Sequence, residues 1–277
     1  MLEERIIDEI ILNALKEDMP MGDITTDNII NPCETSCARF IAKAEGIIAG
    51  VTVAKRVFTL LDPDVRFTTE LPDGTCVNYG DIILEFSGNT RALLKAERTA
   101  LNIIQRMSGI ATRTNAFCKI IEDFDTKVVD TRKTTPGLRY IEKYSVRVGG
   151  GQNHRYCLSD GVLIKDNHIK AAGGIIPAVK RVRNSIPHTI KIEVETENFD
   201  MINEALEAGV DIIMLDNMST EDMAKAVKII DGRALTEASG DIDEEKLLAV
   251  AKTGVDIISI GRITHSVKSM DISMRFV

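Results

Sequence analysis

The pattern of hydrophobic and polar positions changes twice along the chain. Near the start, apolar residues recur every three or four positions among acidic ones, which predicts an amphipathic helix over residues 2–16. Residues 36–86 show short apolar runs separated by turn residues such as Pro72-Asp-Gly74, a pattern typical of strands around one helix. A long helical pattern over residues 90–121 is interrupted at Ser108-Gly109. We therefore predict a mixed α/β first domain that ends near this glycine.

Beyond this boundary the pattern becomes regular. Six apolar runs have the length of a strand: residues 128–129, 161–164, 189–194, 211–215, 233–236 and 256–260. Helical segments alternate with these runs, as parallel strands require. Four positions at successive strand ends lie 21, 23 and 22 residues apart: Glu195, Asp216, Ser239 and Gly261. This spacing predicts a (β/α) barrel.

Composition and charge exclude several classes of function. The 277 residues are 44% hydrophobic and 27% charged, and no apolar run approaches the 18–20 residues, roughly, of a membrane span. The net charge of −8 argues against a broad nucleic-acid surface. The first residues lack the basic region and cleavage site of a signal peptide, so we expect a cytoplasmic protein. Five cysteines without a CxxC pair predict reduced, mostly buried thiols.

Polar residues follow each predicted strand, at the face where (β/α) barrels carry their active sites. One group is cationic and suits an anion with more than one carboxylate: Arg132, Lys133, His154, Arg155 and Lys165. Glu195 and Asp216 follow consecutive strands and suit a metal-bound polyphosphate or a developing cation. Ser239-Gly240 and Gly261 offer backbone N–H groups where barrel enzymes often hold a phosphate.

Ten motifs in a fixed order carry a family resemblance. They are residues 17–26, 97–102, 108–112, 130–137, 149–155, 163–169, 193–195, 215–217, 237–240 and 264–266. The most specific is Asp130-Thr-Arg-Lys-Thr-Thr-Pro-Gly137. Together they resemble quinolinate phosphoribosyltransferase, also named nicotinate-nucleotide pyrophosphorylase (carboxylating), of the type II phosphoribosyltransferases.

The resemblance implies an architecture and an assembly. We expect an N-terminal α/β sandwich domain of residues 1–108, with residues 268–277 packing back on it, and an incomplete (β/α) barrel of residues 109–267. The resemblance also implies a homodimer, or a higher oligomer, whose active site is shared across the interface. Arg98 would then enter the neighbouring subunit's site.

The resemblance also implies a reaction. Phosphoribosyl pyrophosphate and quinolinate would give nicotinate mononucleotide, pyrophosphate and CO2, a step of NAD biosynthesis. The implied substrate-binding residues are Arg98, Thr131, Arg132, Lys133, His154, Arg155, Lys165, Glu195, Asp216, Ser239, Gly240 and Gly261. Among them Lys133, Glu195 and Asp216 would be catalytic, and Glu195 and Asp216 would meet Mg²⁺. The last three, from Ser239 on, would hold the 5′-phosphate.

Other interpretations stay open at this point. They are a related phosphoribosyltransferase that uses nicotinate, a homologue associated with molybdate transport, a lyase with a Schiff-base lysine, and a non-catalytic phosphate-binding barrel. One position departs from the family, which usually has two glycines after the serine at position 239, whereas this chain has Gly240-Asp241. We expect Asp241 to point away and cap the helix beginning near Asp243. Weaker phosphate binding is the alternative.

Overall fold

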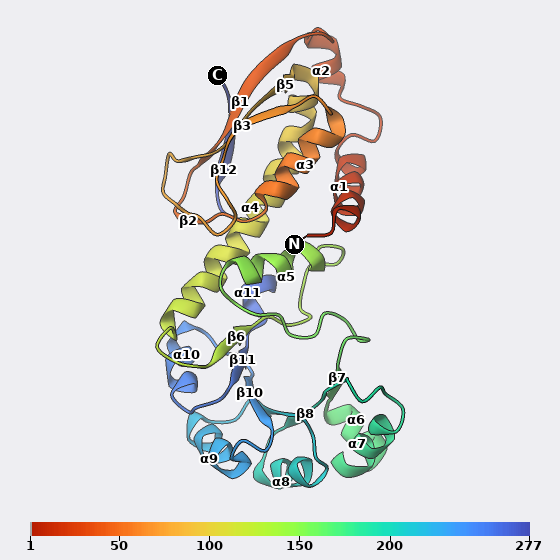
Figure 1. Cartoon of the computed structure of the whole chain (residues 1–277), viewed down its shortest axis with the longest axis vertical. Coiled ribbons are helices and arrows are strands. Elements are labelled where there is room, and N and C mark those ends of the chain that lie inside the picture. The colour runs from red at the N-terminus through yellow and green to blue at the C-terminus, as the bar shows by residue number, and fades with distance from the viewer. Residues whose placement is uncertain (1) are drawn as a thin grey trace. The chain divides into compact units, whose positions relative to one another are not determined.

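The computed structural model describes residues 2–277, which form two compact units (Figure 1). The first unit comprises the described residues up to Asn115, residues 134–150 and residues 263–277. The second comprises residues 116–133 and 151–262. The units are compact bodies rather than contiguous stretches of sequence, and the predicted domains of residues 1–108 and 109–267 stay a prediction.

An antiparallel sheet forms the centre of the first unit, with strand order β12-β1-β5-β3. Its strands are β12 (Ile272–Phe276), β1 (Thr35–Ala42), β5 (Ile82–Asn89) and β3 (Arg66–Glu70). The C-terminal strand therefore pairs with the first strand of the chain. A small second sheet joins β2 (Gly46–Ile47) and β4 (Cys76–Val77).

Apolar side chains hold the helices of this unit to its sheet. The helices are α1 (Glu4–Asp18), α2 (Ile24–Ile29), α3 (Val51–Leu61), α5 (Arg139–Val148) and the first part of α4 (Thr90–Ile120). Phe40, Phe58 and Phe86 are fully buried and pack together with ring centroids 4.3–5.8 Å apart. Ile7 and Ile11 are buried on one side of α1, which confirms the predicted amphipathic helix.

The predicted interruption at Ser108-Gly109 is wrong, because α4 continues through both residues. A side chain on Gly109 would overlap the backbone carbonyl oxygen of Lys268. The glycine thus allows the C-terminal segment to pack closely on the helix, and glycine alone does not break a helix with such tertiary support.

The second unit is built on a parallel sheet with strand order β6-β11-β10-β9-β8-β7. The strands are β6 (Lys127–Val129), β7 (Val162–Ile164), β8 (Ile192–Thr196), β9 (Ile212–Asp216), β10 (Leu235–Ser239) and β11 (Ile257–Ser259). Among residues 2–277, β6 and β7 do not pair, so the barrel is open between them. The parallel sheet and the separate α/β unit confirm the predicted fold class.

Five helices cover the outer face of this sheet, side by side (Figure 1). They are α6 (Asp166–Ala172), α7 (Ile175–Arg183), α8 (Phe199–Glu207), α9 (Thr220–Ile230) and α10 (Glu244–Ala251). The short helix α11 (Arg262–His265) follows β11. Within residues 2–277, no helix has both the length and the apolar character needed to cross a bilayer.

The five cysteines are unpaired in the structure, as predicted, but the expectation that most are buried is wrong. Cys33, Cys37 and Cys76 are exposed, and Cys118 and Cys157 are partly buried. Cys37 is exposed because it lies at an outward position of β1, where buried and less buried residues alternate.

Candidate active site

The carboxyl ends of the parallel strands bring the predicted polar residues to one edge of the sheet. Asp216 is the last residue of β9 and lies directly opposite Ser239, the last residue of β10. Glu195 lies on the neighbouring strand β8, opposite Met214 of β9. Lys165 follows β7 at once. The spacing of the strand ends in the sequence thus correctly predicted that these residues share one edge.

Lys165 and Glu195 connect the cationic and anionic groups predicted from the sequence. The Lys165 Nζ donates a hydrogen bond to Glu195 Oε2 at 2.9 Å. The lysine side chain is 46% exposed, so an incoming anion can reach it. His168 supports this loop, because its Nδ1 accepts a hydrogen bond from the backbone N–H of Lys165 at 3.0 Å.

Asp130 is the fully buried anchor of the segment that carries His154. Its carboxylate accepts hydrogen bonds from Asn153 Nδ2 at 2.6 Å and from the His154 backbone N–H at 3.0 Å. Thr131, Arg132 and Lys133 follow directly, and the backbone N–H of Lys133 donates to Thr131 Oγ1. The end of β6 therefore fixes two of the predicted binding segments at once.

Both ring nitrogens of His154 contact other residues of this chain. Nδ1 accepts a hydrogen bond from the Arg155 backbone N–H at 2.8 Å. Nε2 lies 3.0 Å from Glu193 Oε2 and 3.5 Å from Glu237 Oε1. Nε2 therefore faces both carboxylates, and its 3.0 Å distance to Glu193 Oε2 is of hydrogen-bonding length. The place of His154 in the cationic group stays a prediction.

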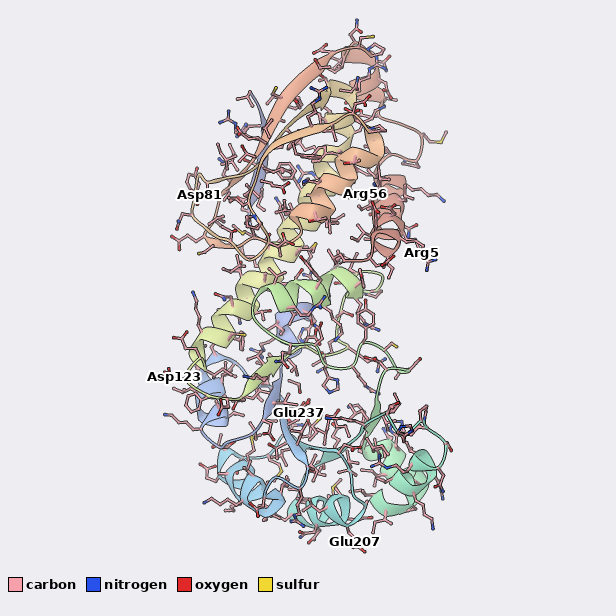
Figure 2. All side chains as sticks on the ribbon, viewed as in Figure 1. Arg5, Arg56, Asp81, Asp123, Glu207 and Glu237 are labelled. Atoms are coloured by element: carbon pink, nitrogen blue, oxygen red, sulfur yellow. The ribbon has the colours of Figure 1, made fainter. Side chains whose placement is uncertain are left out.

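Glu193 and Glu237 are two site residues that the sequence reasoning did not select. Both are buried, with side-chain exposures of 4% and 1%. Burial and the nearby Glu193 carboxylate raise the pKa of Glu237 to about 7, against the opposing effect of His154. Figure 2 shows Glu237 among the strands, whereas Glu207 lies at the outer edge of the same unit.

The alternation of a strand is the signal that could have found these two residues. Side chains two positions apart on a strand share a face. Glu193 therefore lies on the same face as Glu195, and Glu237 on the same face as Ser239, each two residues farther from the carboxyl end of its strand. Together with His154 they place three metal-ligating groups within 4.8 Å of one another. Nε2 lies within hydrogen-bonding distance of Glu193 Oε2, whereas Glu237 Oε1 has no hydrogen-bond partner among residues 2–277.

Arg155 and Arg132 supply the positive charge near this cluster. Arg155 Nη1 donates to the backbone carbonyl of Gly161 at 2.9 Å. Burial, and then the like charge of Arg132, lower the pKa of Arg155. Arg155 also lines a cavity of about 460 Å³ beside β7, α6 and α7, the only predicted site residue to do so in the described chain. This cavity is otherwise mostly apolar and does not include Glu195 or Asp216.

The loops after β9 and β10 are held together closely. The backbone N–H of Asn217 donates to the carbonyl of Ser239 at 3.0 Å. Gly240 has φ +106°, and a Cβ there would overlap the Asn217 side chain, so this turn requires glycine. Gly261 lies two residues beyond β11, the neighbour of β10.

The expectation that Asp241 caps the next helix is wrong. Asp243 is the N-cap of α10, because its carboxylate accepts a hydrogen bond from the Lys246 backbone N–H at 3.0 Å. Asp241 instead forms an ion pair with Arg262, 2.7 Å between Oδ1 and Nη2. Arg98 belongs to the first unit, where it is exposed on α4.

Comparison with known families accounts for this arrangement. The family model described as quinolinate phosphoribosyl transferase, N-terminal domain, matches residues 23–108, and the corresponding C-terminal domain matches residues 110–275. The chain belongs to the quinolinate phosphoribosyltransferase family. The resemblance inferred from the motifs is therefore confirmed.

Members of this family resemble the chain over nearly its whole length. A probable nicotinate-nucleotide pyrophosphorylase (carboxylating) of Bacillus subtilis is 48% identical and aligns over 93% of this chain and 89% of its own. A mitochondrial quinolinate phosphoribosyltransferase (decarboxylating) of Nicotiana glauca is 40% identical and aligns over 96% of this chain and 81% of its own. The crystal structure of NadC from Streptococcus pyogenes is 44% identical, with a TM-score of 0.97 over 100% of this chain and 98% of that one.

Proposed function

We propose that this chain transfers the phosphoribosyl group of phosphoribosyl pyrophosphate to quinolinate, with loss of CO2, to give nicotinate mononucleotide and pyrophosphate. Relatives at 40–48% identity with this activity in their names support the proposal. The observation that carries it is the contact between Lys165 and Glu195, because it joins a cationic set to an acidic set at one sheet edge. The two carboxylates of quinolinate require the cationic set, and the ribose, which becomes cation-like during the transfer, requires the acidic set.

The transfer step follows from the charges at this edge. The pyridine nitrogen of quinolinate forms a bond to the anomeric carbon while the bond from that carbon to pyrophosphate oxygen breaks. The ribose becomes cation-like as the bond lengthens, and Glu195 and Asp216 stabilise that charge without a covalent bond. Lys133, exposed after β6, neutralises the departing pyrophosphate. The step needs no general base.

The decarboxylation step uses the product of the first step. Once alkylated, the pyridine nitrogen is positive, and the adjacent ring carbon can hold the electron pair left when the C–C bond to its carboxylate breaks. CO2 leaves and the carbon takes up a proton. Arg132, Arg155 and Lys165 hold the two carboxylates in place, since arginine can bind a carboxylate through two parallel hydrogen bonds.

Glu195 and Asp216 have the donor chemistry for Mg²⁺, which prefers carboxylate oxygens together with substrate phosphates and water. When bound, Mg²⁺ neutralises the charge of the pyrophosphate group. Asn217 Nδ2 donates to Asp216 Oδ2 at 2.7 Å and so orients this carboxylate. We include Mg²⁺ in the proposal on this donor set.

We further propose a homodimer in which Arg98 of one subunit reaches the quinolinate site of the other. Large apolar side chains near α2 support an interface in this unit, since Met21, Ile24 and Ile29 are 94%, 81% and 73% exposed. Arg98 itself is exposed on α4. The unpaired cysteines support a reducing, cytoplasmic location.

The test is pyrophosphate release from phosphoribosyl pyrophosphate and Mg²⁺, with quinolinate or nicotinate as acceptor and the nucleotide identified by mass. Release with quinolinate and not with nicotinate is expected. Turnover of nicotinate alone would place the chain with nicotinate-using relatives, and ligand binding without release would indicate a non-catalytic barrel. Trapping of a lysine adduct by borohydride with a carbonyl substrate would instead support a lyase.

A further inference from the structure

An ion pair joins the loops that follow β10 and β11. These strands are parallel neighbours, with Ala238 opposite Ile258, so their carboxyl ends lie side by side. Arg262 Nη2 donates to Asp241 Oδ1 at 2.7 Å across the two loops. Each partner directly follows a glycine of the proposed 5′-phosphate site, Gly240 or Gly261. The pair therefore lies at the rim of that site.

The backbone and the charge at Asp241 both need an explanation. Its φ of +32° lies in the left-handed region, which favours glycine. A carboxylate beside a phosphate site also repels the ligand unless a cation neutralises it. Arg262 supplies that cation. Its side chain is 35% exposed and the pair uses Nη2, so the guanidinium fork has other N–H donors with which to bind a second acceptor.

We propose that Arg262 binds the 5′-phosphate of the substrate and of the nucleotide product, and that Asp241 is a positioning residue that holds the guanidinium at the rim. This inference rests on the proposed function. The planar guanidinium has five donors, so it can bond a carboxylate through one edge and a phosphate through another. The rival explanation is that Arg262 only neutralises Asp241 and never contacts the ligand.

A double-mutant cycle separates the two explanations. The variants are Arg262→Ala, Asp241→Asn and the double variant, because asparagine keeps the side-chain shape and tolerates the left-handed conformation. Calorimetry would measure affinity for nicotinate mononucleotide and for nicotinate riboside, which lacks the phosphate. Lys252→Ala is the matched control, since it removes an exposed cation at the far end of α10 in the same unit.

We expect Arg262→Ala to weaken nucleotide binding about 30-fold, within the range for a lost hydrogen bond to a charged group. The affinity of Asp241→Asn for the nucleotide should stay within about threefold of that of wild type, because the substitution removes the carboxylate charge of the pair and leaves the Arg262 cation in place. In the Asp241→Asn background, Arg262→Ala should still weaken nucleotide binding about tenfold. Riboside binding should not change, and Arg262→Lys should restore part of the loss.

Equal nucleotide affinity of Asp241→Asn and the double variant would overturn the inference, because Arg262 would then act only on Asp241. An equal loss for the riboside would also overturn it, since the effect would not involve the phosphate. Urea midpoints of all variants would show whether each is folded. If wild type neither binds the nucleotide nor releases pyrophosphate with quinolinate, the proposed function itself fails, which is a distinct result.

Discussion

Replacing Glu237 with glutamine should stabilise the protein at pH 8 and change little at pH 4.5. Burial and Glu193 raise the pKa of Glu237 from 4.5 to about 7, so folding favours the protonated carboxyl. A group whose pKa is raised by folding contributes its full stability below its unfolded pKa and loses that contribution as pH rises through the folded value. Wild type should therefore lose stability between pH 4.5 and 7, and Glu237→Gln should not.

The size of the effect follows from the two pKa values. The change from 4.5 to about 7 corresponds to about 3 kcal/mol in the free energy of unfolding. Glutamine is nearly isosteric and uncharged, so it removes both the cost of burying a charge and the repulsion from the Glu193 carboxylate. The free energy of unfolding of the variant should exceed that of wild type by an amount that grows as the pH rises to about 7 and stays constant above it.

Urea unfolding followed by circular dichroism, from pH 4.5 to 8.5, would measure this difference. Glu207→Gln is the matched control, because it removes an exposed carboxylate at the end of α8 in the same unit. Its stability should follow wild type throughout. A constant difference between wild type and Glu237→Gln across the range, or a less stable variant at pH 8, would refute the reasoning.

Three further predictions test the site and the packing. Arg155→Ala should raise the KM for quinolinate at least tenfold, roughly, with a smaller change in kcat, and a KM like that of wild type would contradict its placement. Arg98→Ala and Arg155→Ala proteins should recover up to about a quarter of wild-type activity when mixed, since each mixed dimer has one intact site. No recovery after subunit exchange would contradict the shared site. Gly109→Ala should lower the free energy of unfolding by about 1–3 kcal/mol in urea titrations, and unchanged stability would contradict the close approach of Lys268.

The βα repeat explains why so much of the catalytic edge could be predicted from the sequence. One strand, one helix and two loops have a nearly fixed length, so Glu195, Asp216 and Ser239 recur at almost equal spacing. Parallel pairing then places these residues at one edge whatever the details of packing. The (β/α) part of the fold class needed no more information than this repeat, whereas the N-terminal sandwich and the incomplete barrel came from the family resemblance.

What could not be predicted depends on contacts between residues far apart in the chain. Gly109 resembles a helix break in the sequence, but its role depends on Lys268, which packs against it. Asp241 resembles a helix cap, and only the adjacency of β10 and β11 brings Arg262 within 2.7 Å. Local propensity gives a preference at such positions, and tertiary packing decides between the alternatives.

The carboxylates of the open barrel form two levels that differ in burial: a buried lower level with Glu193 and Glu237, and a more exposed upper level with Glu195. We expect the two levels to have different roles. At the lower level Glu237 is 1% exposed, and its raised pKa lets it hold a proton beside Glu193 and His154. At the upper level Glu195 is 16% exposed and pairs with Lys165, so it faces the substrates. Glu193 and Glu195 lie two residues apart on one strand, but each belongs to a different level. They are therefore not interchangeable. A substitution at Glu193 should act through the position of His154, whereas one at Glu195 should act on the ribose directly.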